Sequence, residues 1–83
     1  MRASTRAGLI GIPERDGRFT AARYRVQQAA RGVKQGINGG RIVKLEISLG
    51  GAVVAAYDHG EWTVKPEGEN ANVAYYVCLE NFN

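Results

Sequence analysis

The chain has 83 residues, of which 45% are hydrophobic and 23% are charged, and its formal net charge is +3 at pH 7. This length predicts one domain over residues 1–83, and the composition excludes an intrinsically disordered chain. The longest uncharged apolar run is well short of a membrane span, and the N-terminal residues lead into no signal-type segment, so we expect a cytoplasmic protein without membrane contact. The modest positive charge permits an acidic partner, protein or nucleic acid, without requiring one.

The first predicted element is a strand at residues 8–12 (GLIGI), which Pro13 ends. Residues 14–17 (ERDG) then form a turn that closes on glycine. The following segment has two interpretations. If residues 18–28 form a strand, alternate side chains share a face. If residues 21–35 form a helix, the alanines and valines form a stripe along one side, and the content of alanine, arginine and glutamine favours that helix. The Asp-Gly turn before it favours a hairpin, so the local signals are divided.

A glycine-rich loop at residues 32–40 leads into the middle of the chain. Such loops can cradle phosphates, but this one has no GxGxxG or Walker pattern, and it precedes a strand where a phosphate site would need a helix N-terminus. We therefore interpret it as a tight backbone turn around Asn38-Gly39-Gly40.

Residues 42–49 alternate apolar and polar side chains, which is typical of a half-buried strand. Gly50-Gly51 and a β-rich run at 52–57 follow, and they predict a hairpin because a two-residue type I′ turn needs positive φ at both positions. The core side would carry Val43, Leu45, Ile47 and Leu49. The expected opposed pairs are Leu49–Ala52, Ile47–Val54 and Leu45–Ala56 on the core face, and Ser48–Val53, Glu46–Ala55 and Lys44–Tyr57 on the other.

Residues 58–61 form a second predicted turn, followed by a short strand at 62–65 (WTVK). The tail at 67–83 opens with residues that start helices, including Asn70 as an N-cap. The β-branched and aromatic content of this tail would equally suit a strand. Helical spacing relates Val73, Tyr76, Val77 and Glu80, and Ala74, Cys78 and Leu79 lie beside them. Together the elements predict an α+β fold, an antiparallel β-meander of four to five strands packed against one C-terminal α-helix.

The middle of the chain contains an ordered set of unusual residues: Gly36-Ile37-Asn38-Gly39-Gly40-Arg41-Ile42, Lys44-Leu45, Tyr57-Asp58, Gly60, Trp62 and Pro66. They resemble a family of small uncharacterised bacterial and phage proteins with a GINGGRIxKL…YDRGW…P pattern, over about half the chain. The resemblance implies a strand at 18–28 and a helix after the proline. This chain departs from the pattern at the second turn, where His59 replaces the usual arginine and Glu61 separates Gly60 from Trp62. The family implies no activity.

A compact antiparallel sheet with one helix, in a small basic chain, is also similar in kind to several phage-encoded anti-CRISPR inhibitors. Those proteins act as stoichiometric plugs on nucleic-acid-binding surfaces of bacterial defence complexes. The likeness is one of size and architecture, and a fold by itself does not determine a function. It implies a host protein or nucleoprotein complex, such as a CRISPR effector, as the partner.

A first group of candidate partner-binding residues is expected near the central hairpin. Lys44, Tyr57 and Trp62 would share the hairpin face away from the core, where an aromatic pair beside a cation can form a recognition patch. The competing interpretation is that the helix covers this face and Trp62 is core, since a small sheet must bury its largest aromatic side chain. Arg41 is a further candidate, with an ion pair to Asp58 as its structural alternative.

A second group of candidates is basic, and on a strand its alternate members would line one face. Such a stripe suits phosphates or an acidic protein surface. The competing interpretation is a solvated strand face that discourages edge-to-edge pairing. The group consists of Arg18, Arg23, Arg25, Arg31 and Lys34.

The sequence offers little for catalysis. His59 is the only histidine and Cys78 the only cysteine, and no paired carboxylates, second imidazole or cofactor motif accompany them. We therefore expect no enzyme, cofactor or metal. The expected function is a small non-catalytic binding protein of phage or mobile-element type that inhibits a complex of its bacterial host, as a monomer or homodimer. The competing hypothesis is a basic nucleic-acid-binding domain that uses the arginine-rich strand face. A third hypothesis is a purely structural homo-oligomer joined through edge strands.

Overall fold

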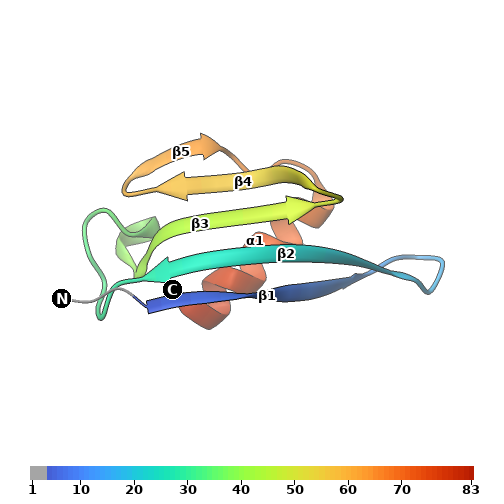
Figure 1. Cartoon of the computed structure of the whole chain (residues 1–83), viewed down its shortest axis with the longest axis horizontal. Coiled ribbons are helices and arrows are strands. Elements are labelled where there is room, and N and C mark those ends of the chain that lie inside the picture. The colour runs from blue at the N-terminus through green and yellow to red at the C-terminus, as the bar shows by residue number, and fades with distance from the viewer. Residues whose placement is uncertain (1–3) are drawn as a thin grey trace.

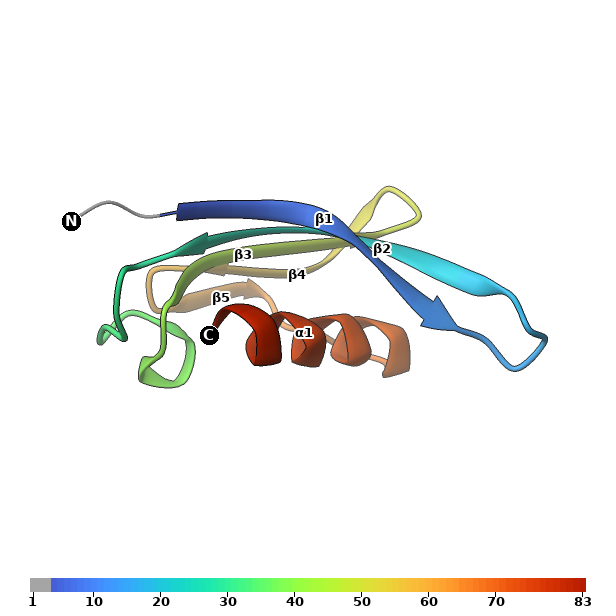
Figure 2. The same ribbon diagram turned by 90° about the horizontal axis from the view of Figure 1, so that it is seen from below.

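The computed structural model describes residues 4–83, which form a five-stranded antiparallel sheet with one helix on one of its faces (Figures 1 and 2). The strands lie side by side in chain order, and the predicted α+β meander with a C-terminal helix is confirmed. The opposite face of the sheet carries no other element of this part of the chain (Figure 2). The elements are β1 (Ser4–Pro13), β2 (Phe19–Gln28), a 3₁₀ turn (Ile37–Gly39), β3 (Ile42–Leu49), β4 (Ala52–Asp58), β5 (Glu61–Val64) and α1 (Glu69–Phe82).

The ambiguous segment after the first turn is strand β2, as the family resemblance implied. It pairs along its whole length with β1 and along most of its length with β3. Ala22 and Val26, which fit a helical stripe equally well, lie on its buried face. Hydrogen bonding to a strand on each side outweighs the helix propensity of alanine, arginine and glutamine, which is less than about 1 kcal/mol per residue. The same pairing extends β1 beyond the predicted residues 8–12.

The central hairpin turns at Gly50-Gly51, whose φ angles of 57° and 82° fit the predicted type I′ geometry. The two pairs nearest the turn, Leu49–Ala52 and Ser48–Val53, are as predicted. A β-bulge then follows, because Ile47 pairs with Ala55 and leaves one extra residue on β4. The predicted pairs beyond it are therefore wrong by one residue: Leu45 lies opposite Tyr57, Glu46 opposite Ala56 and Lys44 opposite Asp58. A one-residue slip moves every later side chain of β4 to the other face of the sheet.

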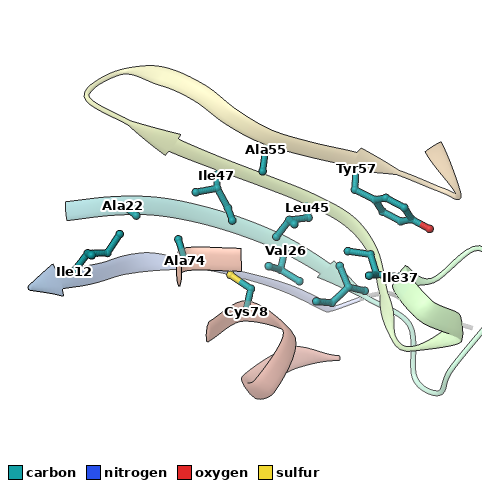
Figure 3. Packing of buried hydrophobic residues seen from close by; sticks show 11 residues of the cluster. Ile12, Ala22, Val26, Ile37, Leu45, Ile47, Ala55, Tyr57, Ala74 and Cys78 are labelled. Carbon is teal, nitrogen blue, oxygen red and sulfur yellow. The ribbon is translucent and has the colours of Figure 1, made fainter. Parts of the chain in front are cut away.

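The hydrophobic core lies between the sheet and α1 (Figure 3). The predicted dry side of β3 is confirmed, since Val43, Leu45 and Ile47 are all buried. Burial of such side chains stabilises the fold by about 1.5–3 kcal/mol each. The cluster includes Ile12, Ala22, Val26, Ile37, Ile42, Leu45, Ile47, Ala55, Tyr57, Ala74 and Cys78.

Helix α1 contacts the sheet through small side chains. Its buried positions are Ala71, Ala74 and Cys78, each about one turn after the last. These small side chains let the helix backbone lie close to the strands. Of the residues noted at helical spacing, Tyr76 is 60% exposed and Val73 is 37% exposed, and the helix packs instead through Ala74 and Cys78 beside them.

The start of α1 also differs from the prediction. Gly68 is the N-cap and has no side chain to donate or accept, whereas Asn70 lies inside the helix. The Asn70 amide donates a hydrogen bond to Glu14 in the β1–β2 turn, and the Thr20 hydroxyl donates to the same oxygen. These two donors lower the pKa of Glu14, Thr20 contributing more than Asn70. The helix start is thus anchored to the first hairpin rather than capped by its own side chain.

Candidate binding surface on the open face of the sheet

Alternation along β2 and β3 sends one set of side chains to the helix and the other to the open face of the sheet. Ala22 and Val26 point to α1, so Arg23 and Arg25 project from the opposite side and are exposed. Lys44 on β3 is also exposed, and its cross-strand neighbour on β2 is Gln27. The structure therefore brings together three of the predicted site residues, the two arginines and the lysine.

The basic side chains border two open hollows. The larger, of about 420 Å³, runs from β1 across β2 to β3, and Leu9, Arg23, Arg25 and Glu46 are among its lining residues. The smaller, of about 300 Å³, is lined by Thr5, Arg25, Gln27, Lys44 and Glu46. Both hollows lie on the face that α1 leaves uncovered, so a partner can reach them.

Apolar side chains adjoin the arginines on the same face. Leu9 lies opposite Arg23 and is 64% exposed, and Phe19 is 71% exposed at the start of β2. The Phe19 ring lies against Gly11, since a Cβ on that glycine would be 3.4 Å from Phe19 Cδ1. We refer to Leu9, Phe19, Arg23, Arg25 and Lys44 as the open-face patch.

Carboxylates interrupt the positive charge of this patch. Glu46 is the cross-strand neighbour of Arg25, and Asp58 is that of Lys44. Across residues 4–83 the salt bridges are Arg18–Asp16 and His59–Asp58, so the patch cations are not held by internal ion pairs. The Asp58 carboxylate is engaged by His59, whose hydrogen bond lowers the pKa of Asp58.

The remaining basic candidates do not belong to one stripe. Arg18 lies in the turn before β2 and pairs with Asp16, whereas Arg31 and Lys34 lie in the loop beyond the other end of the strand. Arg41 is partly buried, and its Nε donates a hydrogen bond to the Ala29 carbonyl at 2.9 Å. It therefore forms no ion pair with Asp58, and its role in the structure is to hold the loop.

The predicted patch of Lys44 with two aromatic side chains was wrong, because the β4 bulge turns the aromatics to the other face. Tyr57 is buried, and its hydroxyl donates to the Gln35 carbonyl at 2.6 Å. Its ring centroid lies 5.0 Å from that of Trp62, which in turn stacks edge-on against Tyr75 at 5.3 Å. The competing interpretation, Trp62 as part of the core, describes the structure.

The glycine-rich loop is closed by residues that sequence reasoning did not connect. Gly36 lies so close to Gly40 that a Cβ on Gly36 would be 1.8 Å from the Gly40 carbonyl oxygen. From the end of α1, Asn83 donates to the Ile37 carbonyl and accepts from the Ile42 N–H, both at 3.0 Å. No local signal marks Asn83, because its partners are more than 40 residues away. We call this arrangement of Asn83 and the loop at 36–42 the C-terminal clasp.

The comparisons place the chain in a family. Residues 8–83 match the model of the domain of unknown function DUF7678. The chain belongs to this family. No curated protein and no solved structure shows significant similarity to it. The resemblance to an uncharacterised family is thereby confirmed, and in this DUF7678 domain the GINGGRI residues have a structural role, because they form the clasp and its turn.

The cysteine of the DUF7678 domain lies in the hydrophobic core. Cys78 is fully buried, and burial raises the pKa of its thiol to about 11. Within residues 4–83 no three His, Cys, Asp or Glu side chains are grouped to hold a metal ion. In the same part of the chain, no helix has the length and apolar character needed to cross a membrane.

Cys78 therefore provides a direct test of core packing. At neutral pH we expect a thiol-reactive reagent to modify the native domain at least about 100-fold more slowly than the urea-unfolded chain, because the native thiol is neutral and inaccessible. The rate is measured from the absorbance of the released thiolate. Equal rates for native and unfolded protein would show that the Cys78 side of α1 is not packed against the sheet.

Proposed function

We propose that this DUF7678 domain is a non-catalytic binding protein that docks a partner protein through the open-face patch. The more specific proposal is that the domain acts in the cytoplasm of a bacterial host. There it would inhibit a protein or nucleoprotein complex, as anti-CRISPR inhibitors do. The observation that carries it is the exposure of Leu9, Phe19, Arg23 and Arg25 together on the uncovered face of the sheet. Protein interfaces are enriched in aromatic residues and arginine, and these side chains dominate their binding energy.

The charge distribution favours a protein over a nucleic acid as the partner. A phosphate-binding surface gains affinity from unopposed cations. Here Glu46 lies between Arg25 and Lys44 on the same face, and Asp58 lies next to Lys44. Burial of the exposed Leu9 and Phe19 side chains would contribute more binding free energy against an apolar protein surface than against a phosphate backbone.

The alternative function is direct nucleic-acid binding by Arg23, Arg25 and Lys44. These three cations are neighbours on an open sheet, and none has an internal salt bridge in the described part of the chain. Binding of this kind would weaken steeply with salt, because each neutralised phosphate releases counterions.

Charge reversal of the patch tests the function. The domain is used to capture partners from a bacterial lysate, and the affinity of a purified captured protein is then measured. Arg23→Glu/Arg25→Glu should weaken binding by about 100-fold, because both arginines would become repulsive at the centre of the interface. Arg31→Glu/Lys34→Glu changes the net charge by the same amount outside the patch and should bind like the wild type. Equal losses in both variants would contradict the open-face patch as the interface.

A second measurement separates the two functions. The anisotropy of labelled duplex and single-stranded DNA and RNA is followed while the domain is added at several salt concentrations. We expect no binding tighter than about 10 µM at physiological salt. Tight binding that falls steeply with salt, and is lost in Arg23→Glu/Arg25→Glu, would support the nucleic-acid alternative instead.

For the inhibitor form of the proposal, expression of the domain should restore phage plating on a host with an active CRISPR system.

A further inference from the structure

In the described part of the chain, the outer border of the sheet at β1 has no partner strand. β1 pairs with β2 over ten residues on one side, and the strand order places it at the edge (Figure 1). Nothing in residues 4–83 pairs with its other side. Backbone pairing at this edge does not require a partner bound to the open-face patch.

The hydrogen bonds of the first turn show which backbone groups of β1 face outward. Glu14 N–H donates to the Arg18 carbonyl at 2.8 Å, so these two residues form a hydrogen-bonded pair of the ladder. Such pairs alternate along antiparallel strands. Even-numbered residues of β1 therefore bond to β2, and odd-numbered residues turn their N–H and C=O away from it. Thr5, Ala7, Leu9 and Gly11 each present a donor and an acceptor at the edge, and Pro13 presents only its carbonyl.

Of the features that normally prevent pairing with another chain, this edge has only Pro13 at its end and the charged Arg6, whose backbone bonds to β2. Natural edge strands are kept short, bulged or charged. The β1–β2 register continues without a bulge, and the outward-facing residues from Thr5 to Gly11 are small or apolar and carry no charge. The opposite edge, β5, has four residues, a register shift and the charged Glu61. The β5 edge is therefore the better protected of the two.

We propose that two copies of the chain pair antiparallel through their β1 strands, with a two-fold axis at Leu9, to form one continuous sheet. This register is the one that pairs all the outward-facing positions from Thr5 to Pro13. Leu9, 64% exposed in the single chain, then packs against its own counterpart, and Ala7 lies opposite Gly11.

Charge complementarity also favours a second copy as the occupant of this edge. In the two-fold register Arg6 lies diagonal to Glu14 of the other copy, within reach of a long side chain, and the symmetry forms this contact twice. Arg6 and Glu14 both lie on the helix-covered side of the first hairpin, since Arg6 pairs with the buried Val26 and Glu14 contacts Thr20 and Asn70. The dimer would carry both open-face patches on the same side of the joined sheet.

The oligomeric state of the purified chain and of edge variants tests the proposal. Light scattering after size exclusion should show a dimer. Ala7→Pro removes an outward-facing N–H of β1 and leaves the hydrogen bonds to β2 intact. Leu9→Lys places a positive charge at the two-fold axis. Each variant should raise the dimer dissociation constant by at least about 100-fold. Ala21→Lys adds the same charge to the same face one strand further in and should remain dimeric. Circular dichroism and thermal melting establish that each variant is folded. If Ala7→Pro unfolds the domain, Leu9→Lys still tests the proposal, because it changes an exposed side chain.

Cross-linking adds an independent measurement. Paired Cα atoms across a hydrogen-bonded position are about 5.5 Å apart, a distance that a disulfide spans. Leu9→Cys should therefore give a covalent dimer on mild oxidation, whereas Phe19→Cys, exposed on the same face but away from the edge, should not. The native Cys78 is buried in both variants. A monomer at all accessible concentrations, a dimer that persists in folded Leu9→Lys, or equal cross-linking of both cysteine variants would overturn the proposal. Dimerisation retained in Arg23→Glu/Arg25→Glu separates this interface from the open-face patch.

Discussion

Gly36→Ala is expected to lower the free energy of unfolding by about 3 kcal/mol, near the upper end for a single substitution that adds volume. The new methyl group would lie 1.8 Å from the Gly40 carbonyl oxygen and 2.7 Å from its carbon, both of them backbone atoms of the same loop. Gly36 itself has φ −72° and ψ 155°, which any residue adopts, so the effect is one of space and not of backbone freedom. Urea denaturation followed by circular dichroism measures the change.

Gly17→Ala is the matched control for this substitution. Gly17 has φ +85°, but nothing lies within 4 Å of the methyl group that alanine would add, so the substitution would carry only the cost of a left-handed backbone, about 1–2 kcal/mol. Gly36→Ala should be clearly the more destabilising of the two. The reverse order would mean that the loop can move away from Gly36 and that the close approach to Gly40 is not essential.

Asn83→Ala is expected to destabilise the domain by about 2–4 kcal/mol. The substitution removes both side-chain hydrogen bonds of the clasp and leaves the N–H of the buried Ile42 without this partner, whereas the Ile37 carbonyl still accepts from the Gly40 N–H. An unsatisfied buried polar group costs about 1–3 kcal/mol. The same denaturation experiment measures the loss.

Asn81→Ala provides the comparison for the clasp. The Asn81 amide donates to the Val77 carbonyl one turn back on the exposed side of α1, and water can replace that bond. We expect a change within about 0.5 kcal/mol, as for most surface substitutions. If Asn83→Ala were equally mild, the clasp would not contribute to the stability of the fold.

The candidate surface was only partly predictable. Alternation along residues 18–28 correctly places Arg23 and Arg25 on one face, because the side-chain period of a strand is a local property. The aromatic pair was misplaced, because the bulge on β4 has no local signature and decides which face receives Tyr57. That side chain is buried where it contacts Trp62 and reaches the Gln35 carbonyl.

The amino-acid sequence by itself determined the central hairpin and the dry side of β3. The alternating residues 42–49 and the two glycines that follow act over a few residues, through side-chain direction and allowed φ angles. Tertiary structure alone decided the strand state of β2, the bulge in β4 and the clasp at Asn83. These features depend on contacts between residues far apart in the chain, and the energy of such contacts exceeds the small local preferences that a sequence displays.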